Sequence, residues 1–290
     1  MPAASPLRAI ALLVVAVLFF VLLDSTSKYL SRDWPVSLLV WIRYGVHFLL
    51  MTVLLAPRHG RQLIATRRPG LQVLRALCLL VTSWFIVAAL QRMPLAETTA
   101  IIFVAPFLVT VLARHVLGEA VSRLRWSAVA LGFAGVLVVV RPGGVALPPA
   151  GIALALTAAS GFAVYQVLTR ALSPTERPLT LLYYTALVGT LGMTLALPWH
   201  WAGPPPDARA MLLMGAMGVF GGVGHFLLIR AFSLAPASLL SPILYVQLAW
   251  ATLLGWVLFD QLPDGARLLG IAIIAVAGVI TALDSRRAPK

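Results

Sequence analysis

The stretch AIALLVVAVLFFVLLDSTSKYL, residues 9–30, decides the class of the fold. Every residue from Ala9 to Leu23 is apolar, and the run contains neither glycine nor proline. A helix needs about 20 mostly apolar residues to cross roughly 30 Å of hydrocarbon. The stretch therefore predicts a membrane-spanning helix. A signal peptide also has an apolar run, but the next residues, Asp24 to Lys28, are unlike a small-residue cleavage site, so we expect the helix to be retained.

The composition of the whole chain agrees with this interpretation. Of 290 residues, 61% are hydrophobic and 11% are charged, whereas a soluble domain is about half apolar and a quarter charged. The net charge of +13 would suit a nucleic-acid binder. The basic residues are instead dispersed between apolar runs, so we expect a lipid bilayer and no nucleic acid as partner. The single cysteine, Cys78, excludes an internal disulfide and a cysteine-rich metal site.

After residues 9–30, similar apolar runs follow one another to the C-terminal region. Short connections rich in proline and glycine separate them, for example Pro142-Gly143-Gly144 and Pro204-Pro205-Pro206. The sequence therefore predicts an all-α integral membrane protein with ten transmembrane helices, at about 9–30, 36–56, 71–92, 95–117, 124–141, 149–172, 178–198, 208–232, 237–259 and 266–283.

The basic residues also predict an orientation. With both termini in the cytoplasm, 14 of the 22 Lys and Arg residues lie on the cytoplasmic side and six on the other, with Arg43 and Arg75 inside helices. Cytoplasmic loops carry the excess of Lys and Arg in membrane proteins. We therefore expect a multi-pass protein of a bacterial-type inner membrane, with cytoplasmic N- and C-termini.

An internal repeat is the more informative signal. A shift of about 142 residues brings Met51-Thr52 onto Met193-Thr194 and Ala134-Gly135-Val136 close to Ala277-Gly278-Val279. The repeats would be residues 1–145 and 146–290, each with five spans, and an odd number turns the second repeat upside down in the membrane. Inverted repeats are typical of secondary transporters, in which a central site is reached from each side in turn.

Two motifs make the chain similar to a known family. ALQRMPLAETTAI at 89–101 is followed by Pro106 and Leu117-Gly118-Glu119, and RAFSLAPA at 230–237 is followed by Leu258-Phe259-Asp260. Together with the repeat, these resemble the EamA branch of the drug/metabolite transporter superfamily. The second copy departs from the usual Gly-Glu by having Phe259-Asp260, which keeps only the carboxylate.

The resemblance implies a central cavity between two five-helix halves and alternating-access transport of a small organic metabolite, without a cofactor. Within the branch, residues 225–264 look most like bacterial members linked to riboflavin or S-adenosylmethionine uptake. Exporters of amino acids, drugs or other metabolites share the fold and stay an alternative. A proton or another coupling ion is a candidate partner.

Four ionisable residues at membrane depth are candidates for the solute pathway. Asp24 and Arg43 should lie at similar depth on neighbouring antiparallel helices, either as a gate or charge site for the solute or as a structural ion pair. His47 lies one turn from Arg43, and His225 lies in the middle of its span. Each histidine would either couple transport to protons or serve as a neutral hydrogen-bonding group.

Other charged residues are candidates for coupling or gating. For Lys28 we favour a side chain that reaches the membrane interface, and we interpret Arg75 as a residue near the inner face that sets topology. Glu97 begins the fourth span, where a carboxylate complements the helix dipole. Glu119 and Asp260 end the fourth and ninth spans and are expected to serve as gates or helix caps.

Aromatic and amide side chains in the middle of spans would suit an organic-solute pocket, although buried aromatic residues are also ordinary packing. They are Trp84, Tyr165, Gln166, Tyr245, Gln247 and Trp250. Pro106 and Pro242 should break the fourth and ninth spans, which we expect to line the cavity.

Other classes of membrane protein find little support. The glycines at 218–224 are not followed by the Lys-Ser or Lys-Thr of a phosphate-binding loop. No His-Glu-x-x-His or Gly-x-Ser-x-Gly pattern is present, so we expect no catalytic residues and no metal site. A channel would need rings of like charge or a carbonyl filter, and the chain has no obvious ones.

Overall fold

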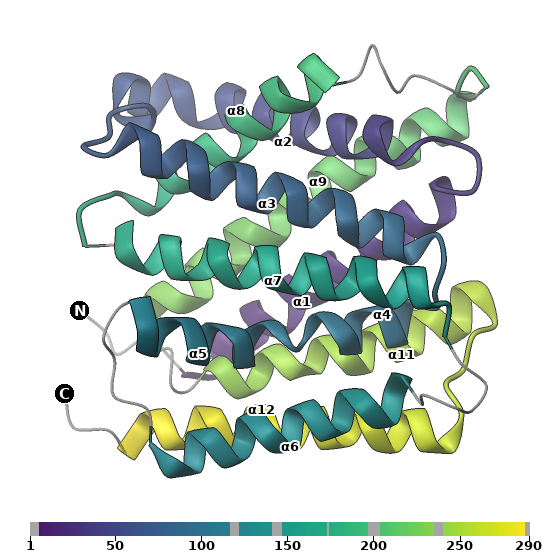
Figure 1. Ribbon diagram of the computed structural model, residues 1–290. Helices are drawn as coiled ribbons and strands as arrows, with labels where there is room; N and C mark the ends of the chain where they lie inside the picture. Colours follow the sequence, from purple (N-terminus) through teal and green to yellow (C-terminus); the bar gives the residue numbers. More distant parts are fainter. Residues whose placement is uncertain are drawn as a thin grey trace.

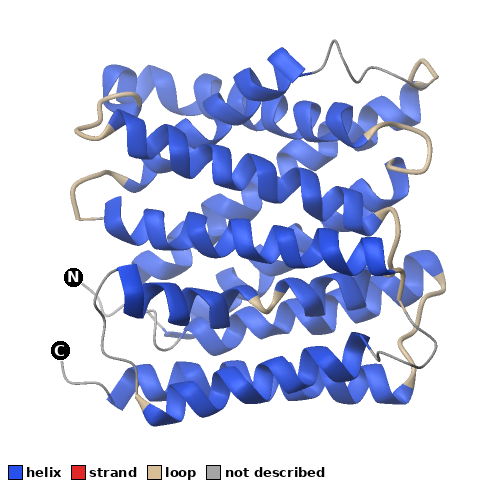
Figure 2. Ribbon diagram, viewed as in Figure 1, coloured by secondary structure: helices blue, strands red, loops and turns tan. Residues whose placement is uncertain are grey.

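The computed structural model describes residues 6–116, 122–140, 147–172, 174–196, 204–234 and 240–287. Within these ranges the chain forms helices and connecting loops and contains no strand (Figure 2). The helices are α1 Pro6–Leu30, α2 Val36–His59, η1 Gly60–Leu63, α3 Pro69–Leu90, α4 Leu95–Ile102, α5 Ala105–Val116, α6 Arg123–Val140, α7 Pro149–Leu172, α8 Pro178–Ala196, α9 Ala208–Leu234, η3 Ser241–Tyr245, α11 Val246–Phe259 and α12 Gly265–Arg287.

These helices correspond to the ten predicted spans. Seven helical segments of the described chain are long and apolar enough to cross a membrane, and three shorter apolar helices accompany them. One of the seven, Leu95–Leu112, runs through both α4 and α5, and one of the short ones, Ile243–Phe259, combines η3 with α11. The predicted all-α membrane fold is confirmed.

The fourth and ninth spans are the irregular ones. α4 ends at Ile102 and α5 begins at Ala105, so Pro106 lies in the first turn of α5, where a residue without an N–H costs no hydrogen bond. In the ninth span, Pro242 lies in the 3₁₀ turn η3, directly before α11. Each proline thus lies where its span changes helical geometry.

Packing between helices repeats with the same order in both halves. α1 of the first half packs along α9 of the second, and α7, the counterpart of α1, packs along α3, the counterpart of α9. Likewise α2 contacts α9 while α8 contacts α3, and α6 pairs with its own counterpart α12 at one side of the molecule (Figure 1). This reciprocal packing is what two inverted five-helix repeats produce.

The α6–α12 pair shows why small residues stand at helix crossings. A Cβ on Gly135 would lie 3.0 Å from the carbonyl oxygen of Gly270, and a Cβ on Gly270 would lie 2.8 Å from that of Gly135. Larger residues at either position would force the backbones apart. Close approach of this kind stabilises helix pairs in membranes, where no hydrophobic force drives them together.

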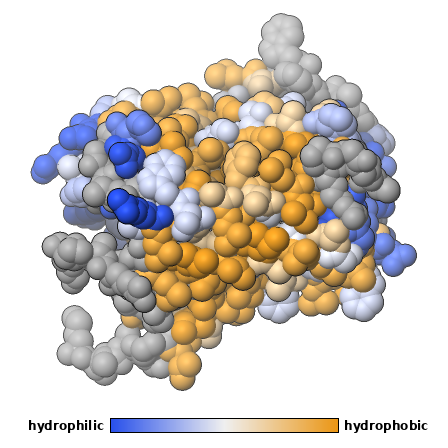
Figure 3. All heavy atoms as spheres, turned by 60° about the horizontal axis from the view of Figure 1, so that its bottom comes forward, coloured by the Kyte–Doolittle hydropathy of each residue, from blue (hydrophilic) through white to orange (hydrophobic). Residues whose placement is uncertain are grey.

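The surface fits a bilayer. Hydrophobic side chains form a broad band across the middle of the molecule, and hydrophilic ones gather towards both ends of the helices (Figure 3). Large apolar side chains such as Leu195 (78%) and Leu212 (73%) are largely exposed. Lipid is the solvent that such a band requires. We name the ends of the bundle by α1, as the Pro6 end and the Leu30 end; α12, the last helix, also ends at the Pro6 end (Figure 1).

Candidate functional site

Polar side chains from three helices gather inside the bundle. Asp24 comes from α1, Arg43 and His47 from α2, and His225 from α9. The imidazole rings of His47 and His225 stack with centroids 6.1 Å apart, and the ring of Phe20 meets His225 edge-on at 4.9 Å. Arg43 interacts electrostatically with Asp24 and with both histidines. We call Asp24, Arg43, His47 and His225 the interior polar cluster.

Helix geometry explains why these residues meet. Asp24 lies six residues before the end of α1, and Arg43 lies seven residues after the start of α2. At 1.5 Å per residue these positions are about 9 and 10 Å below the Leu30 end. The predicted similarity of depth therefore agrees with the helix bounds, and His47 follows one turn deeper on the Arg43 face of α2.

Glycines of α9 allow the approach to α2. A Cβ on Gly221 would lie 3.9 Å from Nε of Arg43, and a Cβ on Gly222 would lie 3.5 Å from Cδ2 of His47. These are ordinary contact distances, so the missing side chains leave room beside Arg43 and His47. At Gly218, by contrast, a Cβ would come within 2.3 Å of the Val46 side chain, which marks a packing contact between α2 and α9.

Asp24 and Arg43 form neither an ion pair nor a hydrogen bond with the described residues. They attract one another, yet no Arg43 nitrogen lies within 4.0 Å of the Asp24 carboxylate, and neither side chain makes a hydrogen bond with the described chain. Both side chains are partly buried. Arg43 lies over the ring of Tyr44 at 5.6 Å. Nε2 of the buried His47 also lacks a hydrogen-bond partner there.

A second polar group lies nearer the Pro6 end, around Arg75 of α3. Its guanidinium donates to the carbonyl oxygen of Leu181 and to the hydroxyl groups of Thr185 (2.8 Å) and Thr169 (3.4 Å). It lies 5.0 Å from the ring of Tyr165, a predicted site residue on α7. Arg75 is 1% exposed and ties α3 to α7 and α8. The interpretation of Arg75 as a topology residue near the membrane face was therefore wrong.

The two polar groups share one electrostatic environment. His225 interacts with the charge of Arg75 as well as with that of Arg43. The sequence analysis did not single out Tyr44. Its hydroxyl group forms a hydrogen bond of 2.8 Å with that of Ser83 on α3, and it interacts electrostatically with both arginines and with Tyr165. Its position next to Arg43 in the sequence was the only signal that could have found it. Polar side chains thus extend through the interior from the Leu30 third to the Pro6 third.

Some of the predicted aromatic and amide residues lie near these two polar groups, and the others lie elsewhere in the bundle. Trp84 packs on the apolar cluster formed by α1, α2, α3, α8 and α9, and Gln166 is half-buried beside Tyr165. Tyr245 instead lies 5.0 Å from the ring of Phe103 and against Gly278 of α12. Trp250 of α11 packs against apolar residues of α1, and its indole nitrogen has no hydrogen-bond partner within the described chain; Gln247 is half-buried in α11.

Two apolar grooves lie away from the interior polar cluster. One, of about 430 Å³, lies between α11 and α12 and is bordered by Tyr245, Trp256 and Leu268. The other, of about 440 Å³, lies between α2 and α9 beside Val46 and Phe220. Their exposed leucine and tryptophan neighbours belong to the hydrophobic band, so lipid chains suit them better than a polar solute.

At the Leu30 end the buried charges are paired. Nζ of Lys28 donates to the carbonyl oxygens of Leu90 (2.7 Å) and Met93 (2.6 Å), and the side chain is only 7% exposed. The expected reach of Lys28 to the membrane interface was therefore wrong. The ammonium group instead holds the α3–α4 corner to α1, because carbonyls at the end of α3 lack helical partners.

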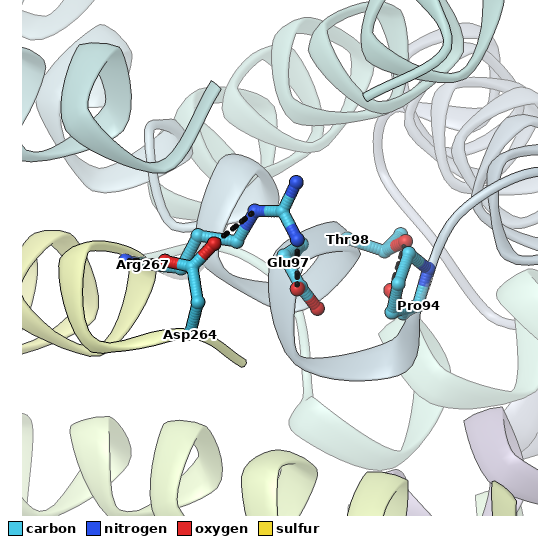
Figure 4. Close-up of polar contacts among 5 residues, drawn as sticks. All are labelled: Pro94, Glu97, Thr98, Asp264 and Arg267. Carbon is cyan, nitrogen blue, oxygen red and sulfur yellow. Dashed lines mark hydrogen bonds and ion pairs between the residues drawn. The ribbon is translucent and has the colours of Figure 1, made fainter. Parts of the chain in front are cut away.

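Glu97 belongs to the same end of the bundle. It lies in the first turn of α4, as predicted, and is 2% exposed. Its Oε1 lies 3.6 Å from Nη1 of Arg267 at the start of α12, whose Nε lies 3.9 Å from Asp264 (Figure 4). Thr98, next in the sequence, donates to the carbonyl oxygen of Pro94 (Figure 4). This arrangement joins the two repeats through α4 and α12.

Of the two remaining candidates, the structure describes Asp260. Asp260 is exposed at the C-cap of α11, with a left-handed φ of 55°. Glu119 lies outside the described residues. Across the described ranges, no group of three or more His, Cys, Asp or Glu side chains is placed to hold a metal ion.

Comparison with known proteins gives the same architecture. A model of the EamA-like transporter family matches residues 7–141 and again residues 149–283. Similar curated proteins include an S-adenosylmethionine uptake transporter of Rickettsia bellii, 27% identical with 91% of this chain and 90% of the relative covered. A riboflavin transporter of Vibrio cholerae is 27% identical over 94% and 92%, and the pseudopaline exporter CntI of Pseudomonas aeruginosa is 25% identical over 92% and 93%.

A solved crystal structure shares the fold. It superposes with a TM-score of 0.68 at 20% identity, covering 94% of this chain and 97% of the other. At this identity the likeness concerns the fold alone.

Proposed function

Because the chain belongs to the EamA-like transporter family, we propose that it is a secondary carrier that works by alternating access around the interior polar cluster. The family, together with relatives that are named as transporters and are matched over at least nine tenths of their length, shows that the chain transports a small metabolite and is not an enzyme. The proposal adds the mechanism and the site. The solute gradient or a coupling ion would supply the drive.

The observation that carries the proposal is the position of the charges that stay unpaired within the described chain. Ionisable side chains at membrane depth are costly and face one another, a cavity or a pathway. Asp24 and Arg43 lie in the first repeat and His225 in the second, so the cluster spans the boundary between the halves. A relative movement of the halves would therefore change the surroundings of a bound solute, which is the differential binding that alternating access requires.

We place the division between the repeats at residue 145, and the Leu30 end on the periplasmic side, with both termini cytoplasmic. Fourteen of the 22 Lys and Arg residues then face the cytoplasm. Lys28 and the Glu97–Arg267 pair would act as a periplasmic gate, and Asp260 and Glu119 as caps or gates at the ends of the ninth and fourth spans. A proton is the candidate coupling ion, with the His47–His225 pair as its carrier.

S-adenosylmethionine and riboflavin are the first candidate solutes, since relatives that match more than nine tenths of the chain are named as an S-adenosylmethionine uptake transporter and a riboflavin transporter. Export is the alternative direction of transport, since another relative is named as a pseudopaline exporter.

Transport into proteoliposomes tests the proposal. Purified protein should give saturable uptake of a labelled solute, and preloading the vesicles with unlabelled solute should accelerate it. Uptake that stays linear with concentration and shows no such stimulation would identify a channel and contradict a carrier.

A further inference from the structure

We infer that the segment from Arg58 to Arg68, which joins α2 to α3 at the Pro6 end, binds the phosphate headgroup of an anionic phospholipid (Figure 1). We call this segment the basic loop. Its four arginines hold the phosphate, and the apolar faces of α2 and α3 that lead to the loop hold the acyl chains. This binding concerns the lipid around the protein and does not depend on the proposed carrier mechanism.

The basic loop carries a concentrated positive charge. Its sequence, RHGRQLIATRR, contains four arginines and no acidic residue. All four arginines are exposed, and no carboxylate of the described chain lies within 4.0 Å of their guanidinium groups. Glu176 reaches the loop, but it is buried, and its Oε1 accepts the main-chain N–H of Arg67 at 3.0 Å. The guanidinium groups are therefore available to an external anion.

The loop is folded against the bundle and is not a charged tail. Gly60, with a φ of 46°, ends α2 and lets the 3₁₀ turn η1 begin. Leu63, the last residue of η1, is buried in an apolar cluster that includes Met51 of α2 and Tyr183 of α8. Side chains on either side of Leu63 in the sequence are exposed. The loop thus has a buried anchor and a charged outer surface.

Hydrogen bonds from the second repeat fix the loop further. Thr180 donates to the main-chain oxygen of Gln62 at 3.0 Å, and Tyr184 donates to that of Ile64 at 3.0 Å. Arg177, which is exposed, donates to Oε1 of Gln62 at 2.6 Å and so brings a fifth guanidinium group next to the loop. Binding groups that are already held in place lose less entropy when a ligand binds.

The apolar surfaces beside the loop fit acyl chains. Val53 and Leu54 of α2 are 61% and 64% exposed, and Arg58 lies one turn beyond Leu54 on the same face. On α3, Leu74 is an exposed apolar residue less than two turns after Arg68. Acyl chains of the bilayer lie against such residues, and the phosphate attached to them lies at the membrane surface, at the level of the guanidinium groups.

Orientation in the membrane does not explain this arrangement. It requires an excess of basic residues on one side but no particular grouping. Other exposed arginines of the Pro6 end come from separate helices, namely Arg8 of α1, Arg114 of α5 and Arg123 of α6. Clusters of about four to eight basic residues directly beyond a membrane helix bind anionic headgroups, and the planar fork of arginine matches phosphate oxygens bidentately.

A lipid series tests the class of ligand. The full-length protein in detergent is titrated with phosphatidylglycerol, with phosphatidylcholine, whose headgroup has no net charge, and with glycerol 1-phosphate, which lacks acyl chains. Affinities are taken from the melting temperature, since a bound ligand stabilises by mass action. We expect phosphatidylglycerol to bind at least roughly tenfold more tightly than either of the others. Its binding should weaken as salt rises above about 0.1 M, because salt screens exposed charges.

Two variants with equal losses of charge locate the site. The loop variant is Arg58→Gln/Arg61→Gln/Arg68→Gln. Since each basic residue near an anionic surface contributes about fivefold to affinity, this variant should bind phosphatidylglycerol about 100-fold more weakly. The matched control removes three charges from exposed positions elsewhere at the same end and should bind like the wild type, in Arg8→Gln/Arg114→Gln/Arg123→Gln.

The fold of the loop variant should survive, because the guanidinium groups that it removes make no hydrogen bond or ion pair with the described chain. Its melting temperature without lipid should therefore equal that of the wild type. If the triple variant fails to fold, Arg61→Gln alone should weaken the binding of phosphatidylglycerol about fivefold.

Three results would overturn the inference. Equal stabilisation by the two lipids would show that charge does not select the ligand. Equal weakening in the loop variant and its control would show that total positive charge attracts lipid without a site. Binding of glycerol 1-phosphate as tight as that of phosphatidylglycerol would identify a site for a soluble phosphate and refute its assignment to a lipid.

Discussion

Lys28 and Asp24 lie one helical turn apart on α1, but their charges have different surroundings. Lys28 is held by two main-chain carbonyls, and nearby Glu97 pairs with Arg267. Asp24 and Arg43 attract each other without touching, and no hydrogen bond from the described chain reaches either. Charges that the protein pairs itself stabilise the arrangement of helices. Charges that it leaves unpaired are available to a solute, so mutations in the two regions should differ in what they damage.

The largest effect is expected for Asp24→Asn. Removing the charge should lower transport of the physiological solute roughly 100-fold, since losing one partner of a buried charge pair costs about 2–5 kcal/mol. The melting temperature of the ligand-free protein should not fall, because Asp24 makes no hydrogen bond or ion pair with the described chain. Uptake by proteoliposomes and thermal denaturation measure the two quantities. If the variant transported the solute at the wild-type rate, this carboxylate would have no role in transport.

Arg75→Leu should show the opposite pattern. It leaves the Leu181 carbonyl and two threonine hydroxyls without their buried donor, which we expect to cost about 3 kcal/mol of stability. The melting temperature in detergent should fall accordingly. Arg114→Gln, an exposed position on α5, is the control and should leave it unchanged. A variant of Arg75 as stable as the wild type would contradict the structural role.

Lys28→Met keeps the length of the side chain and removes its ammonium group. Both carbonyls at the α3–α4 corner lose a charged donor, so we expect a loss of about 2 kcal/mol. If Lys28 belongs to a periplasmic gate, a thiol-reactive probe added from outside should also label Cys78, the single cysteine and a partly buried residue of α3, more quickly in the variant. Unchanged labelling together with reduced stability would limit Lys28 to packing.

The smallest effect is expected for the Glu97–Arg267 pair. A double-mutant cycle with Glu97→Gln and Arg267→Gln should give a coupling free energy of about 1 kcal/mol, as contacting residues in ion-pair networks do. Thermal denaturation of the four proteins provides it. A coupling free energy indistinguishable from zero would mean that Arg267 and Glu97 contribute to stability independently of each other.

Much of the architecture could be predicted because the membrane imposes it. The lengths of the apolar runs predicted ten membrane spans, and the internal repeat predicted how the two sets of five are related. Counting residues along the first two helices predicted that Asp24 and Arg43 lie at a similar depth in the membrane. Residue counting gives depth along a helix but not which neighbours its side chains meet. The sequence therefore did not reveal that Arg75 reaches α8, or that Lys28 turns to the α3–α4 corner instead of the interface. Tyr44 was missed because tyrosines are common near membrane surfaces and its partner Ser83 is distant in sequence.

The contact of Lys28 with Leu90 and Met93 involves only main-chain oxygen atoms of those residues. Any amino acid presents the same carbonyl, so this link sets no requirement on the side chains at positions 90 and 93. In a comparison of homologues the lysine should then be retained without co-varying with positions 90 and 93. Methods that infer contacts from correlated substitutions would overlook the attachment of α1 to this corner.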